Sequence, residues 1–335
     1  MKDLKKNTRN SRDGYLHYGG YIVSAIRCEY LSKRYGAQVA LDGVTIEVPE
    51  RSIFGFLGPN GSGKTTMIKL LMGMSRPSAG CAWVNGNEVV ADAPEMRAQI
   101  GYLPDVPNFY DWMRGEEFLR FVGELHHIPF ADSVSRSHEL LELVGLQKSG
   151  KRKIGGYSRG MKQRLGLAQA LMNRPKVLFL DEPCSALDPM GRRDVLNIIL
   201  KLRKSTTVFM STHILSDVER VCDSLAIINK GKLIATSTVE ALRRRFALSS
   251  FDLELDSDPA EFIILLEGQS WVQKVEKLEI SSAYGLRVQA GDVQAAKQEL
   301  PQMIAANRLG LVRYEMTMPS LEDIFVQLVE DEVRS

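Results

Sequence analysis

Two kinds of apolar pattern alternate along the chain and predict an α/β protein. Polarity alternates residue by residue over 26–30 and 44–48, which is typical of half-buried antiparallel strands. Unbroken apolar runs over 53–57, 176–181 and 206–211 instead predict strands that are covered on both faces, as in a parallel sheet.

Helical periodicity fills the intervals between these strands. It is found around 68–72, in 116–127, in 137–144 and in the stretch that ends before Pro175. In 116–127 the apolar side chains on one face are Phe118, Phe121, Val122 and Leu125. Strands that alternate with helices predict a layered α/β core.

After residue 245 the pattern changes and predicts a smaller second domain. The expected order is strand, helix, strand, strand, helix, strand over 250–255, 259–267, 272–279, 283–289, 293–307 and 312–318, followed by a last helix over 321–330. This βαββαβ order is typical of a ferredoxin-like α+β domain. We therefore expect a mobile tail at 1–23, an α/β domain at 24–240 and an accessory α+β domain at 241–335.

Composition indicates a globular protein without a strong overall charge. The 335 residues include 44% hydrophobic and 25% charged residues, and a net charge of +2 does not favour nucleic acid as a partner. No apolar run reaches the roughly 18 residues that a membrane span needs. The cysteines at 28, 81, 184 and 222 are far apart, which predicts buried reduced thiols and a cytoplasmic protein.

One segment has the spacing of a phosphate-binding loop. Gly58-Pro-Asn-Gly-Ser-Gly-Lys64-Thr65 matches GxxxxGK[ST] between a predicted strand and a predicted helix. Backbone N–H groups of such a loop and the positive end of the helix bind phosphate. Lys64 is expected to reach the β- and γ-phosphates, and the Thr65 hydroxyl to bind Mg²⁺. The expected nucleotide contacts are Gly58, Pro59, Asn60, Gly61, Ser62, Gly63, Lys64, Thr65 and Thr66.

Two carboxylates follow a buried strand and supply the other half of a nucleotide site. Asp181 is costly to bury unpaired, so we expect it to hold Mg²⁺ through water, with a helix cap or an ion pair as the alternative. Glu182 is placed to orient or deprotonate an attacking water, unless it is simply a solvated acid. The loop and the two acids predict an NTPase without saying which one.

The stretch from Ser158 to Arg164 narrows the choice. Ser158, Gly160 and a helix N-terminus together can form a second anion site, although a capped helix alone has the same sequence. One chain needs only one phosphate loop for its own nucleotide. A second anion site therefore suggests that it binds the γ-phosphate of a nucleotide held by another molecule.

Seven motifs, in order, make the chain resemble the ATP-binding subunits of ABC transporters, and in particular bacterial ABC-2-type exporter ATPases. The resemblance covers about residues 24–240. The motifs are an aromatic residue for adenine at Tyr35, Walker A at 58–66, a Q-loop at 100–105, a signature at 157–161, Walker B at 177–182, a D-loop that ends at Asp188, and a switch histidine at His213.

The resemblance implies ATP and Mg²⁺ as ligands and Lys64, Glu182 and His213 as catalytic residues, with Thr65 and Asp181 at the metal. Two positions depart from the family pattern. Asp105 stands where the Q-loop usually has Gln or Glu, so both a contact with Mg²⁺ and a solvated loop carboxylate remain open. Arg159 replaces the first glycine of LSGGQ, as in exporter-type sequences similar to YSKGMKQ.

The resemblance also implies partners. Two nucleotide-binding subunits, most simply a homodimer, would enclose ATP between Walker A of one chain and Ser158 and Gly160 of the other. Separate transmembrane permease subunits would dock on the Asp105 loop and the helical segment around 105–150, within a helical subdomain at about 105–172, and hold the protein at the inner face of the cell membrane. ATP would close the pair and hydrolysis would open it, powering transport, with export favoured.

Other functions explain parts of the sequence. A soluble ABC-type ATPase acting on ribosomes or chromosomes shares the motifs, but such proteins usually have two such domains or a long coiled coil, which this sequence lacks. A small-molecule kinase leaves the signature unexplained, and a non-catalytic regulatory module requires that Asp105 and Arg159 impair turnover. The segment 321–325 resembles the closing helix of exporter ATPases and is expected to pack back on the core, or else to stabilise the dimer or sense a ligand.

Overall fold

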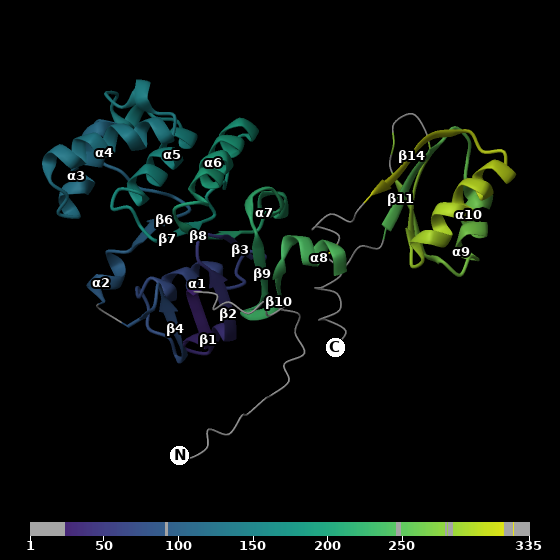
Figure 1. Cartoon of the computed structure of the whole chain (residues 1–335), viewed down its shortest axis with the longest axis horizontal. Helices are drawn as coiled ribbons and strands as arrows, with labels where there is room; N and C mark the ends of the chain where they lie inside the picture. Colours follow the sequence, from purple (N-terminus) through teal and green to yellow (C-terminus); the bar gives the residue numbers. More distant parts are fainter. Residues whose placement is uncertain are drawn as a thin grey trace, which may run out of the picture.

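A six-stranded sheet forms the centre of the α/β core (Figure 1). The computed structural model describes residues 24–90, 93–245, 249–278, 280, 284–317 and 324. The strand order is β10-β9-β3-β8-β7-β6, and β10 alone runs antiparallel to its neighbour. The strands are β3 (Ile53–Leu57), β6 (Ile100–Leu103), β7 (Val177–Asp181), β8 (Thr207–Thr212), β9 (Ser224–Asn229) and β10 (Lys232–Thr238). Every residue of β3, β7 and β8 is buried, which confirms the prediction of strands covered on both faces.

An antiparallel sheet of order β2-β1-β4-β5 covers one side of this core. Its strands are β1 (Ser24–Tyr35), β2 (Gln38–Pro49), β4 (Ala79–Val84) and β5 (Asn87–Glu88). Helix α1 (Lys64–Leu71) contributes Met67 and Ile68 to the apolar cluster between the two sheets, where Phe209 packs against Phe54 and Phe56. The alternating burial of Val44, Ile46 and Val48 in β2 confirms the period-two prediction. In β1 the prediction is wrong at Tyr30, which is 75% exposed, because a register shift between Cys28 and Leu31 interrupts the alternation.

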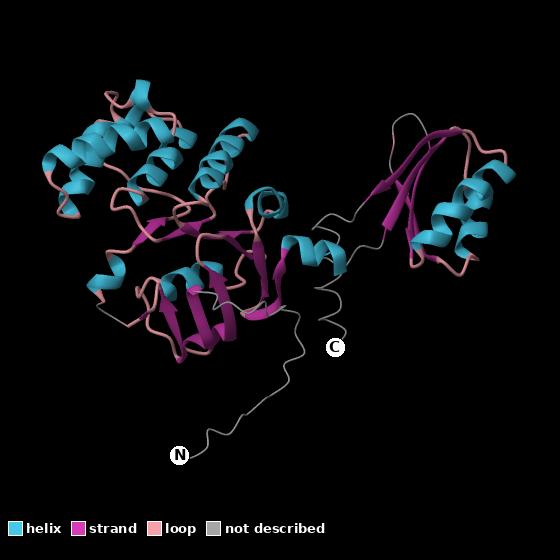
Figure 2. Ribbon diagram, in the orientation of Figure 1, coloured by secondary structure: helices cyan, strands magenta, loops and turns pink. Residues whose placement is uncertain are grey.

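Helices cover the other face of the six-stranded sheet (Figure 2). The helices of this layer are α3 (Gly115–Leu125), α4 (Phe130–Leu143), α5 (Arg159–Ala170) and α6 (Pro189–Leu202). Three shorter helices of the α/β core are α2 (Pro94–Arg97), α7 (Leu215–Val221) and α8 (Val239–Arg245). Helix α4 begins seven residues earlier than the pattern predicted, because the buried serines of its first half make that half look polar; the Ser137 hydroxyl donates to the Ser133 carbonyl at 2.7 Å.

The predicted apolar face of α3 is wrong at one position. Phe118 and Val122 are buried, but Leu125 is 63% exposed, and Leu119 takes its place in the core. Helix α3 ends at Leu125, where the chain turns away. The Leu125 side chain, in the last turn of α3, therefore extends past the helices that cover Phe118 and Val122.

The C-terminal residues form a separate antiparallel sheet with helices on one face (Figure 2). The order β12-β13-β11-β14 and the succession of elements confirm the predicted βαββαβ arrangement. The elements are β11 (Ser249–Leu255), α9 (Ala260–Glu267), β12 (Val272–Leu278), β13 (Tyr284–Ala290), α10 (Val293–Ala306) and β14 (Leu311–Thr317). The predicted tail at 1–23 and the predicted last helix lie outside the described residues, apart from Ile324.

Ile324 is buried in the α/β core, with 1% of its surface exposed. It joins an apolar cluster that contains Leu57 at the end of β3, Val218 of α7 and Leu242 of α8. This contact agrees with the expectation that the closing segment packs back on the core.

Burial of the cysteines is only partly as predicted. All four thiols are free, and Cys28 and Cys184 are buried, but Cys81 is exposed. Cys81 lies in the first half of β4, whose three leading residues face solvent. No helix in the described part of the chain is long and apolar enough to cross a bilayer.

Candidate nucleotide site

The carboxyl ends of three adjacent parallel strands bring the predicted motifs together. Leu57 of β3 pairs with Thr212 of β8, and Asp181 of β7 pairs with Ser211 of β8. The phosphate loop, the acidic pair and His213 each directly follow one of these strands. They therefore meet at one edge of the sheet, where open α/β sheets bind ligands.

The loop before α1 has a backbone that requires glycine. Gly63 caps α1 with φ of +113°, and a Cβ there would lie 2.5 Å from the Ala40 carbonyl oxygen. A Cβ on Gly58 would lie 2.3 Å from the carbonyl oxygen of Ile228. The Gly231 N–H also donates to the Ser62 carbonyl at 2.9 Å, so the β9–β10 hairpin supports the loop from behind.

Lys64 points back over this loop and is 6% exposed. Its ammonium donates to the carbonyls of Gly58 at 2.8 Å and Pro59 at 3.2 Å. The ammonium also lies 3.1 Å from Glu182 Oε1. Lys64 is thus a buried cation at the N-terminus of α1, held by two carbonyls and one carboxylate. Such a cation is suited to bind an anionic phosphate.

Asp181 is buried and accepts two hydroxyl hydrogen bonds. Thr65 Oγ1 donates to one carboxylate oxygen at 2.9 Å, and Ser211 Oγ donates to the other at 2.5 Å. Mg²⁺ prefers hard oxygen ligands and is usually held by one or two carboxylates together with phosphates and water. The Thr65 and Asp181 oxygens fit that ligand set. Ser211 was missed from the sequence, although its position at the end of a neighbouring strand pointed to it.

Glu182 and His213 form a pair next to this carboxylate. His213 Nδ1 lies 2.9 Å from Glu182 Oε2. Glu182 has φ of +48°, a conformation that costs a non-glycine residue about 1–3 kcal/mol. The backbone N–H of Glu182 donates to the Ser211 carbonyl at 3.1 Å, which holds this turn in place.

Asp105 and Tyr102 lie on the side of the site formed by β6. Burial, and then the negative charges of Asp181 and Asp105, raise the pKa of Tyr102 to about 12. Both carboxylates therefore lie near the Tyr102 phenol. Asp105 Oδ1 is shielded from solvent and has no hydrogen-bond partner among the described residues.

Tyr35 and Ser158 lie at exposed positions, whereas Tyr157 of the signature is buried. Tyr35 ends β1, and the Lys33 ammonium lies 4.9 Å from its ring centroid. Ser158 caps α5 by accepting from the Met161 N–H at 3.2 Å, and Asp188 caps α6 by accepting from Gly191 at 3.0 Å. Within the described residues, Ser158 makes no hydrogen bond to the loop 58–66.

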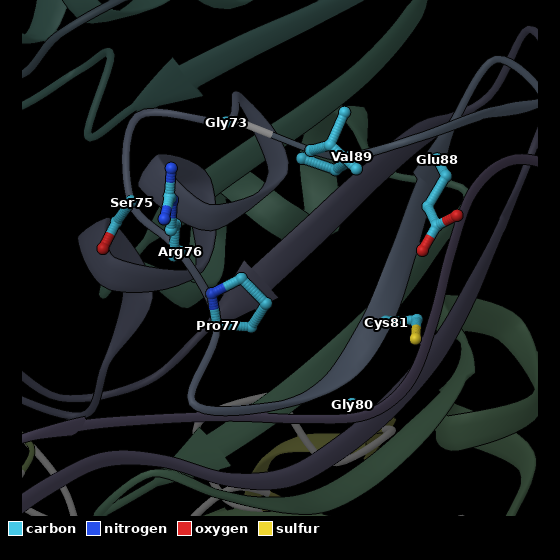
Figure 3. A pocket seen from close by; sticks show the side chains of 9 residues that line it. Gly73, Ser75, Arg76, Pro77, Gly80, Cys81, Glu88 and Val89 are labelled. Carbon is cyan, nitrogen blue, oxygen red and sulfur yellow. The ribbon is translucent and has the colours of Figure 1, made fainter. Parts of the chain in front are cut away.

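A hollow of about 460 Å³ lies away from these residues, behind the C-terminal end of α1 (Figure 3). Arg76, Cys81 and Glu88 are among its lining side chains. Since none of the predicted site residues lines it, this hollow is distinct from the candidate site.

Comparison with known proteins assigns the family. A profile of the ABC transporter family matches residues 41–185, and a profile of the DrrA1-3-like ATP-binding protein C-terminal domain matches residues 238–329. The uncharacterized ABC transporter ATP-binding protein YxlF of Bacillus subtilis is 37% identical over 301 residues, which cover 90% of this chain and 98% of that protein. The chain belongs to the ABC transporter ATP-binding proteins.

A transport protein and a solved structure agree with this assignment. The bacitracin transport ATP-binding protein BcrA of Bacillus licheniformis is 34% identical over 310 residues, covering 92% of this chain and 98% of that one. A solved ATP-binding subunit of an ABC transporter superposes with a TM-score of 0.60 at 32% identity, over 67% of this chain and 93% of that one. The protein is thus an ATP-binding, ATP-hydrolysing ABC transport subunit.

Proposed function

We propose that this ABC subunit hydrolyses MgATP between two copies of itself and powers export through a separate permease. The observation that carries the proposal is the separation of two anion-binding features in one chain. Lys64, Asp181 and Glu182 are clustered at the sheet edge. Ser158, at the N-terminus of α5, is exposed and hydrogen bonds within its own helix. A second chain that presents Ser158 and Gly160 to the phosphates would complete the site.

Each group at the sheet edge has a role that fits its surroundings. Lys64 would bind the β- and γ-phosphates. Thr65 and Asp181 would hold Mg²⁺, and the bound ion would neutralise the negative charge that develops on the transferred phosphoryl group. Glu182 orients or deprotonates the attacking water, with His213 holding its second carboxylate oxygen. Tyr35 offers an exposed ring for adenine, and Asp188 supports the turn that follows Glu182.

An aromatic surface on the helical layer is the proposed docking site of the permease. This docking surface comprises Val106, Tyr110, Trp112 and Phe121; the Tyr110 ring centroid lies 5.9 Å from that of Trp112 and 6.0 Å from that of Phe121. Trp112 is 70% exposed. The surface begins one residue after Asp105, so a docked partner would act directly on the loop at the nucleotide site. Exposed aromatic clusters are typical of protein–protein contacts.

Docking there would place the protein at the inner face of the cell membrane. The relationship to a bacitracin transport ATPase and to a DrrA-type C-terminal domain supports export as the direction. On this view the protein has three parts, a tail at 1–23, a nucleotide-binding domain at 24–240 and an accessory domain at 241–335.

The dimer is tested with the full-length Glu182→Gln variant. We expect a monomer without nucleotide and a dimer when ATP is added, measured by light scattering after size exclusion. A Glu182→Gln, Ser158→Arg double variant is expected to remain monomeric with ATP. A monomer that hydrolyses ATP at the full rate and never dimerises would contradict the proposal.

The docking surface is tested by coexpression with the membrane protein encoded next to this gene. We expect Trp112→Ser to lose copurification with that protein from detergent-solubilised membranes, while the ATPase rate of the isolated chain stays unchanged. Phe130→Ser removes a similarly exposed aromatic residue of α4 and is the control, expected to copurify normally. Equal recovery of the Trp112 variant would exclude this surface.

A further inference from the structure

One buried carboxylate near the site has no place in the roles above. Asp217 of α7 is 1% exposed. Its Oδ1 accepts from Arg192 Nε at 2.6 Å. Burial, and then the negative charge of Asp217, raise the pKa of the Cys184 thiol, so this buried thiol lies near the same carboxylate. Arg192 Nη2 also donates to the Ser216 hydroxyl at 2.8 Å. A carboxylate in such a position must be held by its partners, because burial alone disfavours its charge.

Cys184 and Arg192 flank the turn that follows Glu182. Cys184 lies two residues after Glu182, and Arg192 lies in the first turn of α6, just after the turn 185–188. One carboxylate therefore binds Arg192 at the end of this turn and lies near Cys184 at its start. The turn contains a second left-handed residue, Ala186 with φ of +49°, so its backbone needs support from its surroundings.

Asp217 also lies four residues after His213 in the chain. The inner contact between His213 and Glu182, at 2.9 Å, and the outer ion pair between Arg192 and Asp217, at 2.6 Å, therefore close a ring. Two pieces of chain, 182–192 and 213–217, complete it. Because the ring is closed, a shift of Asp217 relative to its partner would move both Glu182 and His213.

We propose that Asp217 is a positioning residue for ATP hydrolysis, which fixes the Glu182–His213 pair through Arg192 and α7. Buried ion pairs often contribute little net stability, since desolvation offsets their attraction. A role in geometry accounts for a carboxylate here better than a role in stability does. Misplacing a reacting group by about 1 Å can cost on the order of a hundredfold in rate.

The test compares matched variants of the full-length chain by steady-state MgATP hydrolysis. Asp217→Asn keeps the shape but loses the charge, and we expect kcat to fall about tenfold to a hundredfold while KM changes less than about twofold. Asp252→Asn is the control. It breaks an Arg–Asp pair in the C-terminal sheet, where Arg287 donates to both carboxylate oxygens at 2.8 and 2.9 Å, and should leave kcat unchanged.

Cys184 provides a second variant that does not disturb the ion pair. Cys184→Ala removes the thiol beside Asp217 and is expected to lower kcat, whereas Cys184→Ser keeps a donor and should retain most of it. In a double-mutant cycle, Asp217→Asn should lower kcat much less in a His213→Ala background than in the wild type. Independent effects in that cycle, or full kcat in both Asp217→Asn and Cys184→Ala, would overturn the inference.

The inference about Asp217 rests on the proposed roles of Glu182 and His213. The following results distinguish a failure of those roles from a failure of the inference. An unchanged kcat in Glu182→Gln would remove those roles and the inference with them. A low kcat in Glu182→Gln and in His213→Ala, together with wild-type kcat in folded Asp217→Asn, would overturn the positioning role alone.

Discussion

The Lys64 ammonium lies 3.1 Å from the Glu182 carboxylate, so the proposed phosphate-binding and water-activating groups form an ion pair within one chain. A phosphate at the loop would compete with Glu182 for this cation. We therefore expect Glu182→Gln to bind ATP at least as tightly as the wild type, while kcat falls about a hundredfold or more. Titration with fluorescent ATP and a phosphate-release assay measure the two effects. Weaker ATP binding by the variant would contradict this competition.

Removal of the cation itself should abolish nucleotide binding. Lys64→Ala leaves the phosphates without a charged partner at the loop, and we expect both ATP binding and hydrolysis to be lost. Lys69→Ala removes an exposed lysine from the same helix and serves as the control, with normal activity expected. Equal ATP affinity in the two variants would show that Lys64 does not bind the phosphates.

A site shared between two chains predicts complementation. The variants Lys64→Ala and Ser158→Arg should each be inactive alone. In a mixed dimer, the intact Lys64 of one chain faces the intact Ser158 of the other, so one of the two sites is complete. Random pairing should restore about a quarter of wild-type ATPase activity. No recovery after mixing, with dimers detected, would mean that each chain builds its site alone.

The raised pKa of Tyr102 predicts a change in stability at alkaline pH. Burial and the nearby charges of Asp181 and Asp105 raise this pKa from about 10 to about 12 in the folded chain. The folded state thus holds the phenol proton more tightly than the unfolded state does. Its contribution to stability is complete below pH of about 10 and is lost as pH rises towards about 12.

Denaturant unfolding of the wild type and of Tyr102→Phe measures this effect. The free energy of unfolding of Tyr102→Phe should fall less steeply over that pH range than the wild-type value. Parallel pH dependences of the two proteins would contradict the burial of the Tyr102 phenol beside the two carboxylates.

The burial of Ile324 predicts that the end of the chain stabilises the α/β core. Ile324→Ala leaves a cavity beside Leu57 and Val218, and we expect a loss of about 2–4 kcal/mol in the free energy of unfolding. Ile264 of α9 is exposed, so Ile264→Ala is the matched control, with little change expected. Urea unfolding followed by circular dichroism compares them. A loss below about 0.5 kcal/mol in Ile324→Ala would place its side chain outside the core.

Much of the fold could be predicted because burial leaves a direct trace in the order of residues. The period-two pattern of β2, the apolar runs of β3, β7 and β8, and the βαββαβ order of the C-terminal unit all follow from local geometry. The errors lie where burial depends on a neighbour. Leu125 is apolar but extends past its covering helices, and Ser133 is polar but buried because a backbone carbonyl accepts its proton.

The sequence by itself determined the motifs and therefore the family, since a phosphate loop, an acidic pair and a signature can each be read within a few adjacent residues. Only the tertiary structure decided which distant groups touch. The contacts of Ser211 with Asp181, of Glu182 with Lys64 and of Asp217 with Arg192 each join separate strands, helices or turns. Spacing along the chain does not encode them, because they arise only when the parallel strands align and their ends meet at one edge of the sheet.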